Sequence, residues 1–439
     1  MKLDKGKAAG ATLAGLLAFL LLLTAPAAAF AATSVPAVDH GDTAWILAAS
    51  ALVLFMTLPG LALFYAGLVQ SKHALSVMIH CVAIACLASV LWMAVGYTLA
   101  FDGTAPVIGG LSRLFLAGMG RQSVQGALPE PAFFLFQMTF AVITPGLIVG
   151  AYVERIRFAS VLVFSGLWLL CVYAPVTHWI WGGGWLARLG VMDFAGGLVV
   201  HATAGASALV LAIMLGRRHG FPRDLHPPHS PGMTMIGAGM LWVGWYGFNG
   251  GSALAADGSA AMAMIATHLS ASAAGLVWAI LEKRRFGRSS LIGMVTGVVA
   301  GLATITPASG FVGPAGAFAL GCVGSVVCFY AVDWVKHYLK IDDALDVFAV
   351  HGVGGILGSL MVAILAHPAL GGAGYGLAHD LVGQIGVQVL GVVSIVAFSV
   401  AVTIALVWIT RRTVGLRALD EEIDEGLDVS YHGERAYGP

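Results

Sequence analysis

Apolar residues fill long runs along almost the whole chain, and short polar or glycine-bearing stretches separate one run from the next. Each run covers roughly 20 residues, the length at which an α-helix crosses the hydrocarbon core of a bilayer. No polar stretch between the runs is long enough to form a soluble domain. The pattern predicts an all-α integral membrane protein with eleven transmembrane helices, at residues 43–69, 75–101, 131–152, 157–179, 195–215, 232–256, 259–281, 289–306, 311–334, 347–366 and 384–410.

The N-terminal segment has a different pattern. Three lysines precede a short apolar run at 13–23, and small residues follow that run. This order is typical of a secretory signal peptide with a small-residue cleavage site, and a retained first helix is the alternative. We therefore predict a cleaved signal peptide at 1–32, a membrane domain at 33–410 and a C-terminal tail at 411–439.

Lysine and arginine are distributed unevenly between alternate loops. If the mature N-terminus lies outside, sixteen of the 22 Lys and Arg residues fall on the inner side, three on the outer side and three in the signal peptide. Cytoplasmic loops of membrane proteins carry such an excess. The distribution predicts an odd number of crossings and a cytoplasmic C-terminus.

The composition excludes several functional classes. Hydrophobic residues make up 59% of the chain and charged residues 10%, which no ordinary soluble domain shows. A formal net charge of zero gives no electrostatic reason to expect a nucleic-acid partner. The five cysteines lie inside apolar runs without metal-site or disulfide spacing, so we expect them to be small core residues. We also expect no metal and no other cofactor.

Two apolar segments each begin with an aspartate and contain a histidine a few residues later. One runs from Asp193 to His201 and the other from Asp346 to His351. They are the fifth and tenth predicted helices and run in opposite directions, which indicates an inverted five-helix repeat plus one extra helix. At about 1.5 Å per residue, His201 lies roughly 12 Å from Asp193 and His351 roughly 7–8 Å from Asp346. The two imidazoles can therefore meet near the middle of the membrane.

The histidine pair has more than one interpretation. An ionisable residue within a membrane helix is a candidate functional site, and small residues after each histidine favour a pore lining. A polar contact between helices is the simpler alternative, and a metal site lacks a third ligand beside His201 or His351. We expect Asp193 and Asp346 to cap their helices, and Asp193 also to lend negative potential to an arriving cation.

Aromatic residues and one serine are candidates for holding a cation. The faces of aromatic rings attract cations, tryptophan most strongly, and a serine hydroxyl can accept an ammonium hydrogen bond. Taken singly, each aromatic residue is explained more simply by packing or by an interfacial belt. The candidates are Phe136 and Phe140 in the third segment, Trp181 before three glycines, and Trp245, Phe248 and Ser252 in the sixth segment.

Taken together, these motifs resemble the ammonium transporter family, which is related to the Rhesus proteins. The resemblance extends from about residue 40 to the C-terminus and rests on Phe136–Phe140, Gly150–Arg155, Trp181–Gly184, Asp193–His201, Gly244–Ser252 and Asp346–Gly355. It implies an outer ammonium site, a gate of two phenyl rings, a histidine-lined pore and a homotrimer with one pore per subunit. The implied residues are Trp181, Phe140, Ser252 and Phe136 for the outer site, Phe140 and Phe248 for the gate, and His201, His351 and Trp245 for the pore.

The resemblance implies a transporter of the bacterial branch in the inner membrane, and not an enzyme. Ammonium would be deprotonated on entry, because moving the bare ion through an apolar bore costs many kcal/mol. Ammonia would then pass the histidines, with net electrogenic uptake of ammonium. The alternatives are an ammonium sensor that signals through its tail, a Rhesus-like electroneutral channel and an intramembrane metalloenzyme.

The tail at 411–439 changes from basic to acidic along its length. Such a charged, glycine-bearing end is usually solvated. The resemblance instead implies a cytoplasmic regulatory segment that couples subunits and accepts a PII-type regulator.

Overall fold

The computed structural model describes residues 38–223, 226–375, 377 and 380–438. The part from Val38 onward forms one contact unit. The signal peptide predicted at 1–32 lies outside the described residues.

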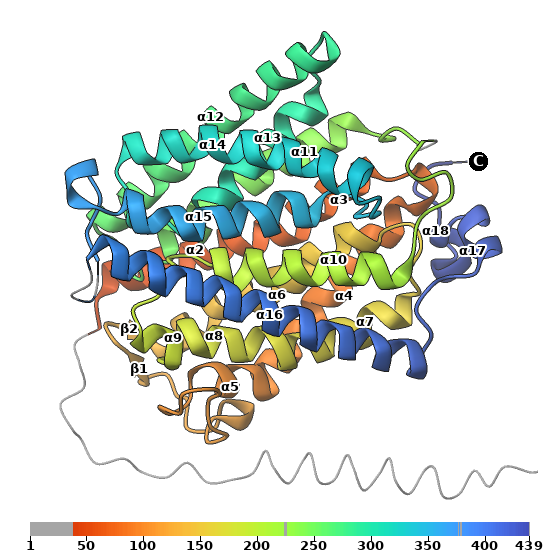
Figure 1. The fold of residues 1–439 in the computed structure, drawn as a ribbon. Helices are drawn as coiled ribbons and strands as arrows, with labels where there is room; N and C mark the ends of the chain where they lie inside the picture. Colours follow the sequence, from red (N-terminus) through yellow and green to blue (C-terminus); the bar gives the residue numbers. More distant parts are fainter. Residues whose placement is uncertain (1–37, 224–225, 376, 378–379, 439) are drawn as a thin grey trace, which may run out of the picture. The chain divides into compact units, whose positions relative to one another are not determined.

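Long helices that run side by side dominate this unit (Figure 1). Many α-helices continue directly into a π-helical turn, so that such a membrane segment contains two to four elements. The helices are α2 (His40–Phe55), η1 (Met56–Leu61), α3 (Ala62–Leu68), η2 (Ser71–His73), α4 (Ala74–Leu91), η3 (Trp92–Gly96), α5 (Tyr97–Phe101), η4 (Leu114–Leu116), α6 (Glu130–Tyr152), α7 (Phe158–Trp168), η5 (Leu169–Tyr173), α8 (Ala174–Ile180), α9 (Trp185–Arg188), η6 (Gly197–Ala202), α10 (Thr203–Leu215), α11 (Pro231–Trp245), η7 (Tyr246–Gly250), α12 (Gly258–Phe286), α13 (Leu291–Ile305), α14 (Pro314–Asp333), η8 (Trp334–Tyr338), η9 (Phe348–Gly352), α15 (Val353–Leu365), η10 (Pro368–Leu370), α16 (Leu381–Thr413), α17 (Asp420–Glu425) and α18 (Leu427–His432). Two short antiparallel strands, β1 (Val124–Gln125) and β2 (Leu128–Pro129), precede α6.

Nine helical stretches among the described residues are long and apolar enough to cross a membrane. They are His40–Leu68, Ser71–Phe101, Glu130–Tyr152, Phe158–Arg188, Gly197–Leu215, Gly258–Phe286, Pro314–Tyr338, Phe348–Leu365 and Leu381–Thr413. Helices also occupy the two other predicted segments: α11 continues into η7, and α13 is a shorter apolar helix. The prediction of a helical membrane protein is confirmed, while the number of eleven crossings stays a prediction.

One of the π-helical turns, η1, contains a proline. Pro59 lies inside η1, where it has no N–H to donate and its ring would clash with the preceding turn of an α-helix. A π-helical turn has wider spacing of the backbone hydrogen bonds, which accommodates the proline. The membrane segment can therefore remain helical on both sides of it.

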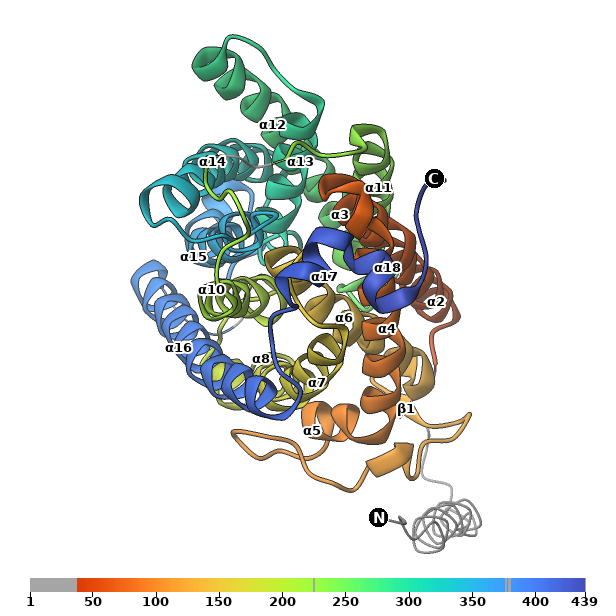
Figure 2. The ribbon, with the colours of Figure 1, turned by 90° about the vertical axis from the view of Figure 1, so that its right-hand side faces the viewer.

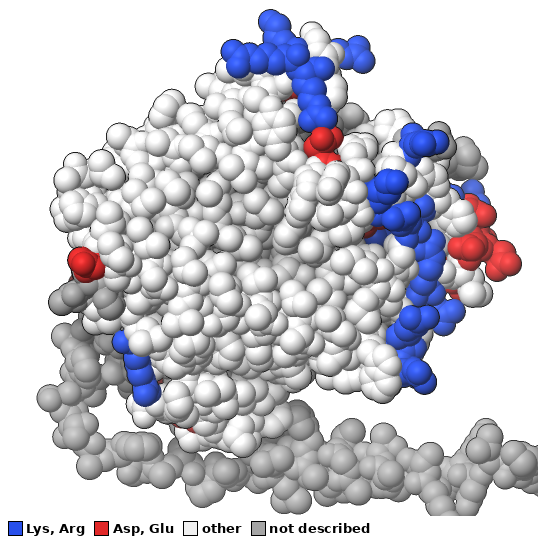
Figure 3. All heavy atoms as spheres, viewed as in Figure 1, with Lys and Arg blue, Asp and Glu red and all other residues white. Residues whose placement is uncertain are grey.

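The C-terminal tail folds back over one end of the helices, which we call the tail end. The amide of Arg157 donates to the carbonyl of Leu416 at 3.1 Å, and the amide of Ala418 donates to the carbonyl of Arg155 at 3.0 Å. Beyond this short ladder, α17 and α18 lie over the ends of α3 and α4 (Figure 2). On the face seen in Figure 3, most Lys and Arg side chains lie at the tail end and on the projecting end of α12.

Candidate functional site

The structure brings the two histidines into contact. His201 lies in η6 and His351 in η9, and their Nδ1 atoms are 3.2 Å apart. The two rings are nearly parallel, with an interplanar angle of 20° and centroids 5.1 Å apart. Both side chains are buried. The meeting expected from the positions of the two segments is therefore present.

Glycines allow the two histidine-bearing segments to approach this closely. A Cβ atom on Gly205 would lie 2.2 Å from the Cα atom of Gly352, so a side chain has no room there. A Cβ atom on Gly355 would lie 2.7 Å from Cβ of His201. Small residues permit such close backbone contact between membrane helices. The glycines, which sequence reasoning noted only as small neighbours, thus permit the close approach of the two histidine-bearing segments.

Asp193 holds the start of η6 with its carboxylate. One oxygen accepts from the amides of Gly196 and Gly197 at 3.0 and 2.6 Å, and the other accepts from Leu198 and Val199 at 2.9 and 3.0 Å. Burial raises the pKa of Asp193 above its ordinary value, and these four hydrogen bonds oppose that rise. The expected helix cap is therefore formed, in a more extensive form than a single side-chain bond.

The second helix cap comes from a residue that the sequence analysis did not single out. Asp343 accepts from the amide of Phe348 at 2.6 Å, whereas Asp346 binds Nζ of Lys336 at 2.7 Å. The capping role expected for Asp346 was therefore wrong. The sequence contained a usable signal, because Asp343 precedes His351 by the same eight residues that separate Asp193 from His201.

The two aspartates near η9 also influence each other. Burial raises the pKa of Asp343 to about 7, and the nearby charge of Asp346 adds to this rise. Burial also raises the pKa of Asp346, while Lys336 opposes the change. A carboxyl group that changes charge near neutral pH thus lies just before the histidine-bearing segment.

Aromatic rings form a continuous series of contacts that ends at the histidines. Trp181 meets Phe140 edge-on, with centroids 5.6 Å apart and an angle of 89°, and Phe136 also packs edge-on against Phe140 at 5.0 Å. Phe140 and Phe248 are stacked at 4.3 Å and 27°. Phe248 lies 6.1 Å from the ring of His201. The order along this series is Trp181, Phe140, Phe248, His201 and His351.

The polar atoms of the two tryptophans are bound elsewhere, which leaves their ring faces for other contacts. Nε1 of Trp181 donates to the carbonyl of Asp193 at 2.9 Å, and Nε1 of Trp245 donates to Oγ1 of Thr306 at 2.9 Å. The ring of Trp245 stacks on His201 at 5.6 Å and 23°. Two hydrogen bonds thus fix the orientation of the two indoles.

Ser252 follows Phe248 by one helical turn. Its hydroxyl donates to the carbonyl of Phe248 at 2.9 Å, so the oxygen lone pairs face elsewhere. A Cβ atom on Gly251 would lie 2.7 Å from the ring of Phe136, so this stretch of backbone packs directly on that ring. Ser252 therefore directly follows the residue whose backbone packs on Phe136.

A cavity of about 10 Å³ lies next to the histidine pair. Such a volume accommodates roughly one molecule of the size of water. Apart from the two imidazoles and the Trp245 indole, whose N–H is bonded to Thr306, its lining is apolar. The lining residues are Met56, Leu61, Phe64, Ile143, Leu147, Val200, His201, Leu241, Trp245, Phe248, Val299 and His351.

A metal site in the described part of the chain would need at least three clustered ligand side chains. No group of three His, Cys, Asp or Glu side chains there is arranged to hold a metal ion. The residues near His201 and His351 are instead apolar or small.

Comparisons with known proteins all match ammonium transporters. The sequence profile described as "Ammonium Transporter Family" matches residues 44–437. A putative ammonium transporter of Methanothermobacter thermautotrophicus is 44% identical over 410 residues, which cover 91% of this chain and 98% of that protein.

Solved structures agree with the sequence matches. The crystal structure of Candida albicans Mep2 superposes with a TM-score of 0.81 at 36% identity, over 88% of each chain. A structure titled "Sensor Amt Protein" superposes with a TM-score of 0.83 at 30% identity, over 89% of this chain and 98% of that chain.

Proposed function

The chain belongs to the ammonium transporter family, whose members are membrane transporters and not enzymes, and from this premise we propose a mechanism of conduction. Ammonium binds at an outer aromatic site, gives up its proton, and passes as ammonia through the cavity beside the histidine pair. The observation that carries this proposal is the cavity itself. It is water-sized and apolar, and its available polar atoms are those of two imidazoles.

The cavity discriminates against the ion on physical grounds. An isolated charge in such surroundings loses its hydration without gaining a counter-charge, which costs many kcal/mol. Ammonia has the size of water and no charge, so the same cavity accepts it at much lower cost. Burial also favours loss of the proton, since it lowers the pKa of an amine by up to about 3–5 units.

Recruitment takes place where rings and a hydroxyl surround the entrance. Trp181, Phe136 and Phe140 offer ring faces to a cation, and Ser252 offers an acceptor oxygen. Beyond them, the stacked rings of Phe140 and Phe248 leave no space between their faces at 4.3 Å. These two rings act as the gate, and one of them must rotate for the substrate to pass.

The histidine contact provides a route for the proton. A neutral pair with Nδ1 atoms 3.2 Å apart needs one donor and one acceptor, so one ring presents an acceptor at Nε2 and the other a donor. Nε2 of His201 has no hydrogen-bond partner among the described protein groups. A proton accepted at one Nε2 can cross the Nδ1 contact and leave from the other. This relay would make uptake electrogenic, with net movement of ammonium.

The distribution of Lys and Arg and the family membership support an orientation in the membrane. We place the tail end in the cytoplasm of a bacterial cell, with eleven crossings of the inner membrane and the mature N-terminus outside. The concentration of Lys and Arg at the tail end supports this orientation. A homotrimer and a cleaved signal peptide at 1–32 complete the proposal.

The docked tail is the proposed site of regulation by a PII-type protein. Truncation after Leu419 removes α17 and α18 but leaves every candidate membrane span intact. We expect the truncated protein to insert normally, to transport less and to lose capture of the cognate regulator. Normal uptake together with normal capture would show the tail to be passive.

An ammonium sensor is the second candidate, because a structure titled "Sensor Amt Protein" is similar over most of the chain. Current recorded after an ammonium concentration jump, with purified protein in liposomes, separates the possibilities. A saturable current supports electrogenic transport. Uptake without current indicates an electroneutral channel, and binding without uptake indicates a sensor.

A further inference from the structure

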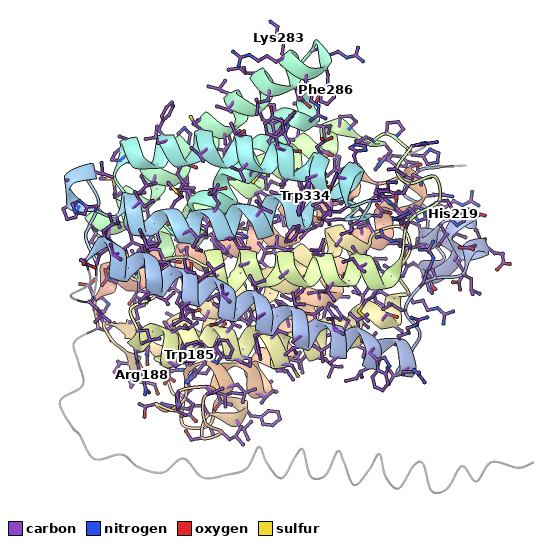
Figure 4. The ribbon with its side chains drawn as sticks, in the orientation of Figure 1. Trp185, Arg188, His219, Lys283, Phe286 and Trp334 are labelled. Carbon is purple, nitrogen blue, oxygen red and sulfur yellow. The ribbon has the colours of Figure 1, made fainter. Side chains whose placement is uncertain are left out.

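A second cavity, of about 100 Å³, lies at the tail end between the tail and the ends of the membrane helices. Lys72, Glu154, Arg155 and Arg218 belong to its wall on the membrane side, and Arg417 and Asp424 to its wall on the tail side. The tail helix that supplies Asp424 lies in front of the helix ends in Figure 2, and His219, also in the lining, is labelled beside α17 in Figure 4. We call this space the tail cavity.

Four charged groups behind the tail cavity neutralise one another. Arg218 binds Glu154 at 2.8 Å and Asp342 at 2.8 Å, and Asp342 lies 3.9 Å from Arg155. The guanidinium of Arg155 donates in addition to four backbone carbonyls, which use its hydrogen-bonding capacity. Burial alone would raise the pKa values of Glu154 and Asp342, but the arginines hold both below their ordinary range. Two cations and two anions therefore balance.

The remaining cations of the tail cavity are less completely paired, because Lys72 binds a backbone carbonyl and Arg417 has a single carboxylate, at 3.9 Å. Nζ of Lys72 donates to the backbone carbonyl of Asp424 at 2.8 Å, and the carboxylate of Asp424 lies on an exposed residue. Nη1 of Arg417 is buried and has no hydrogen-bond acceptor among the residues that the structure describes. The nearest acid, Asp420, is 3.9 Å from Nη2 of Arg417 and is itself mostly exposed.

The Arg417 side chain is 29% exposed, but its buried Nη1 has no acceptor, and a buried N–H donor without an acceptor is costly. We propose that the tail cavity binds a small tetrahedral oxyanion of the phosphate class. Nη1 of Arg417 and Nζ of Lys72 are its donors, one from each wall, so the bound anion joins the tail to the membrane domain. Phosphate combines several acceptor oxygens with the negative charge that this site lacks.

The volume and position of the tail cavity favour a free anion. About 100 Å³ suits a phosphate-sized group, and the tail closes one side of the space. A bound anion would hold the tail docked, because Arg417 precedes α17 and α18 directly. The site thus links the concentration of a soluble anion to the position of the tail.

Calorimetric titration of purified full-length protein with inorganic phosphate, at constant ionic strength in chloride, tests the proposal. We expect saturable binding of one phosphate per chain, with competition by sulfate. Arg417→Gln should weaken binding about tenfold or more, since it removes a charge-assisted donor. Lys72→Gln tests the other wall in the same way. The matched control is Arg411→Gln, which removes the same charge from an exposed position at the end of α16 and should leave affinity unchanged.

Hydrogen exchange provides a second readout. Phosphate should slow exchange of the amides at residues 417–432 in the wild-type protein and not in Arg417→Gln. The absence of saturable binding, equal loss in the Arg411 and Arg417 variants, or unchanged exchange would overturn the proposal. Tighter binding of glycerol 3-phosphate than of phosphate would assign the cavity to a lipid headgroup instead of a free anion.

Discussion

Replacing Asp428 by alanine should release the tail without unfolding the membrane domain. The Asp428 carboxylate accepts from the amide of Leu75 at 3.0 Å and from the amide and hydroxyl of Ser76 at 2.7 and 2.8 Å. These amides belong to the first turn of α4, so a residue of the tail acts as the cap of a membrane helix. Loss of a helix cap costs about 0.5–2 kcal/mol, and the charge complements the helix dipole.

We therefore estimate a loss of about 2 kcal/mol for the docked tail, which corresponds to a roughly thirtyfold larger undocked fraction. Hydrogen exchange read out by mass spectrometry measures this fraction at Leu75, Ser76 and α18. Asp428→Asn keeps one acceptor oxygen and should show an intermediate effect. Glu421→Gln removes a charge from an exposed position in α17 and serves as the control. Unchanged exchange at Leu75 and Ser76 in Asp428→Ala would refute the capping role.

Three further predictions concern the membrane domain. Trp181→Leu should raise the half-saturating methylammonium concentration by at most about thirtyfold with little change in maximal rate, because a cation–π contact is worth roughly 0.5–2 kcal/mol. An unchanged uptake curve would remove Trp181 from the recruitment site. Gly205→Ala should lower the thermal unfolding temperature far more than Gly232→Ala, because the new Cβ would lie 2.2 Å from Gly352 in the first case and has no neighbour within 4 Å in the second. Burial raises the pKa of Asp343 from 3.8 to about 7, so wild-type stability should fall as pH rises from about 4 to about 7. Asp343→Asn should lack that fall. Parallel pH profiles of the thermal unfolding temperature in the wild type and the variant would contradict this.

Sequence patterns were sufficient for those parts of the structure that depend on local periodicity. Runs of apolar residues located the helices, and the spacing of His201 and His351 within opposed segments predicted their contact. The ring series from Trp181 to Phe248 could be listed but not ordered, because packing of side chains from separate helices decides which rings touch.

Features that depend on distant partners were not predictable in the same way. Asp346 was expected to cap a helix, but Lys336 binds it and Asp343 supplies the cap. The contact of Asp428 with Ser76 joins residues 352 positions apart, and no local sequence pattern in the tail predicts it. At Pro59, a π-helical turn likewise replaces regular helix, because proline has no N–H to donate to the preceding turn.

The most direct test of the central claim is the current evoked by an ammonium jump across liposomes that contain wild-type protein, His201→Ala or His351→Ala. A relay through the two Nδ1 atoms, which are 3.2 Å apart, predicts a saturable wild-type current. Each variant should lose this current or begin to admit potassium, while remaining folded and inserted. Wild-type current and undiminished exclusion of potassium in both variants would contradict the role of the histidine pair.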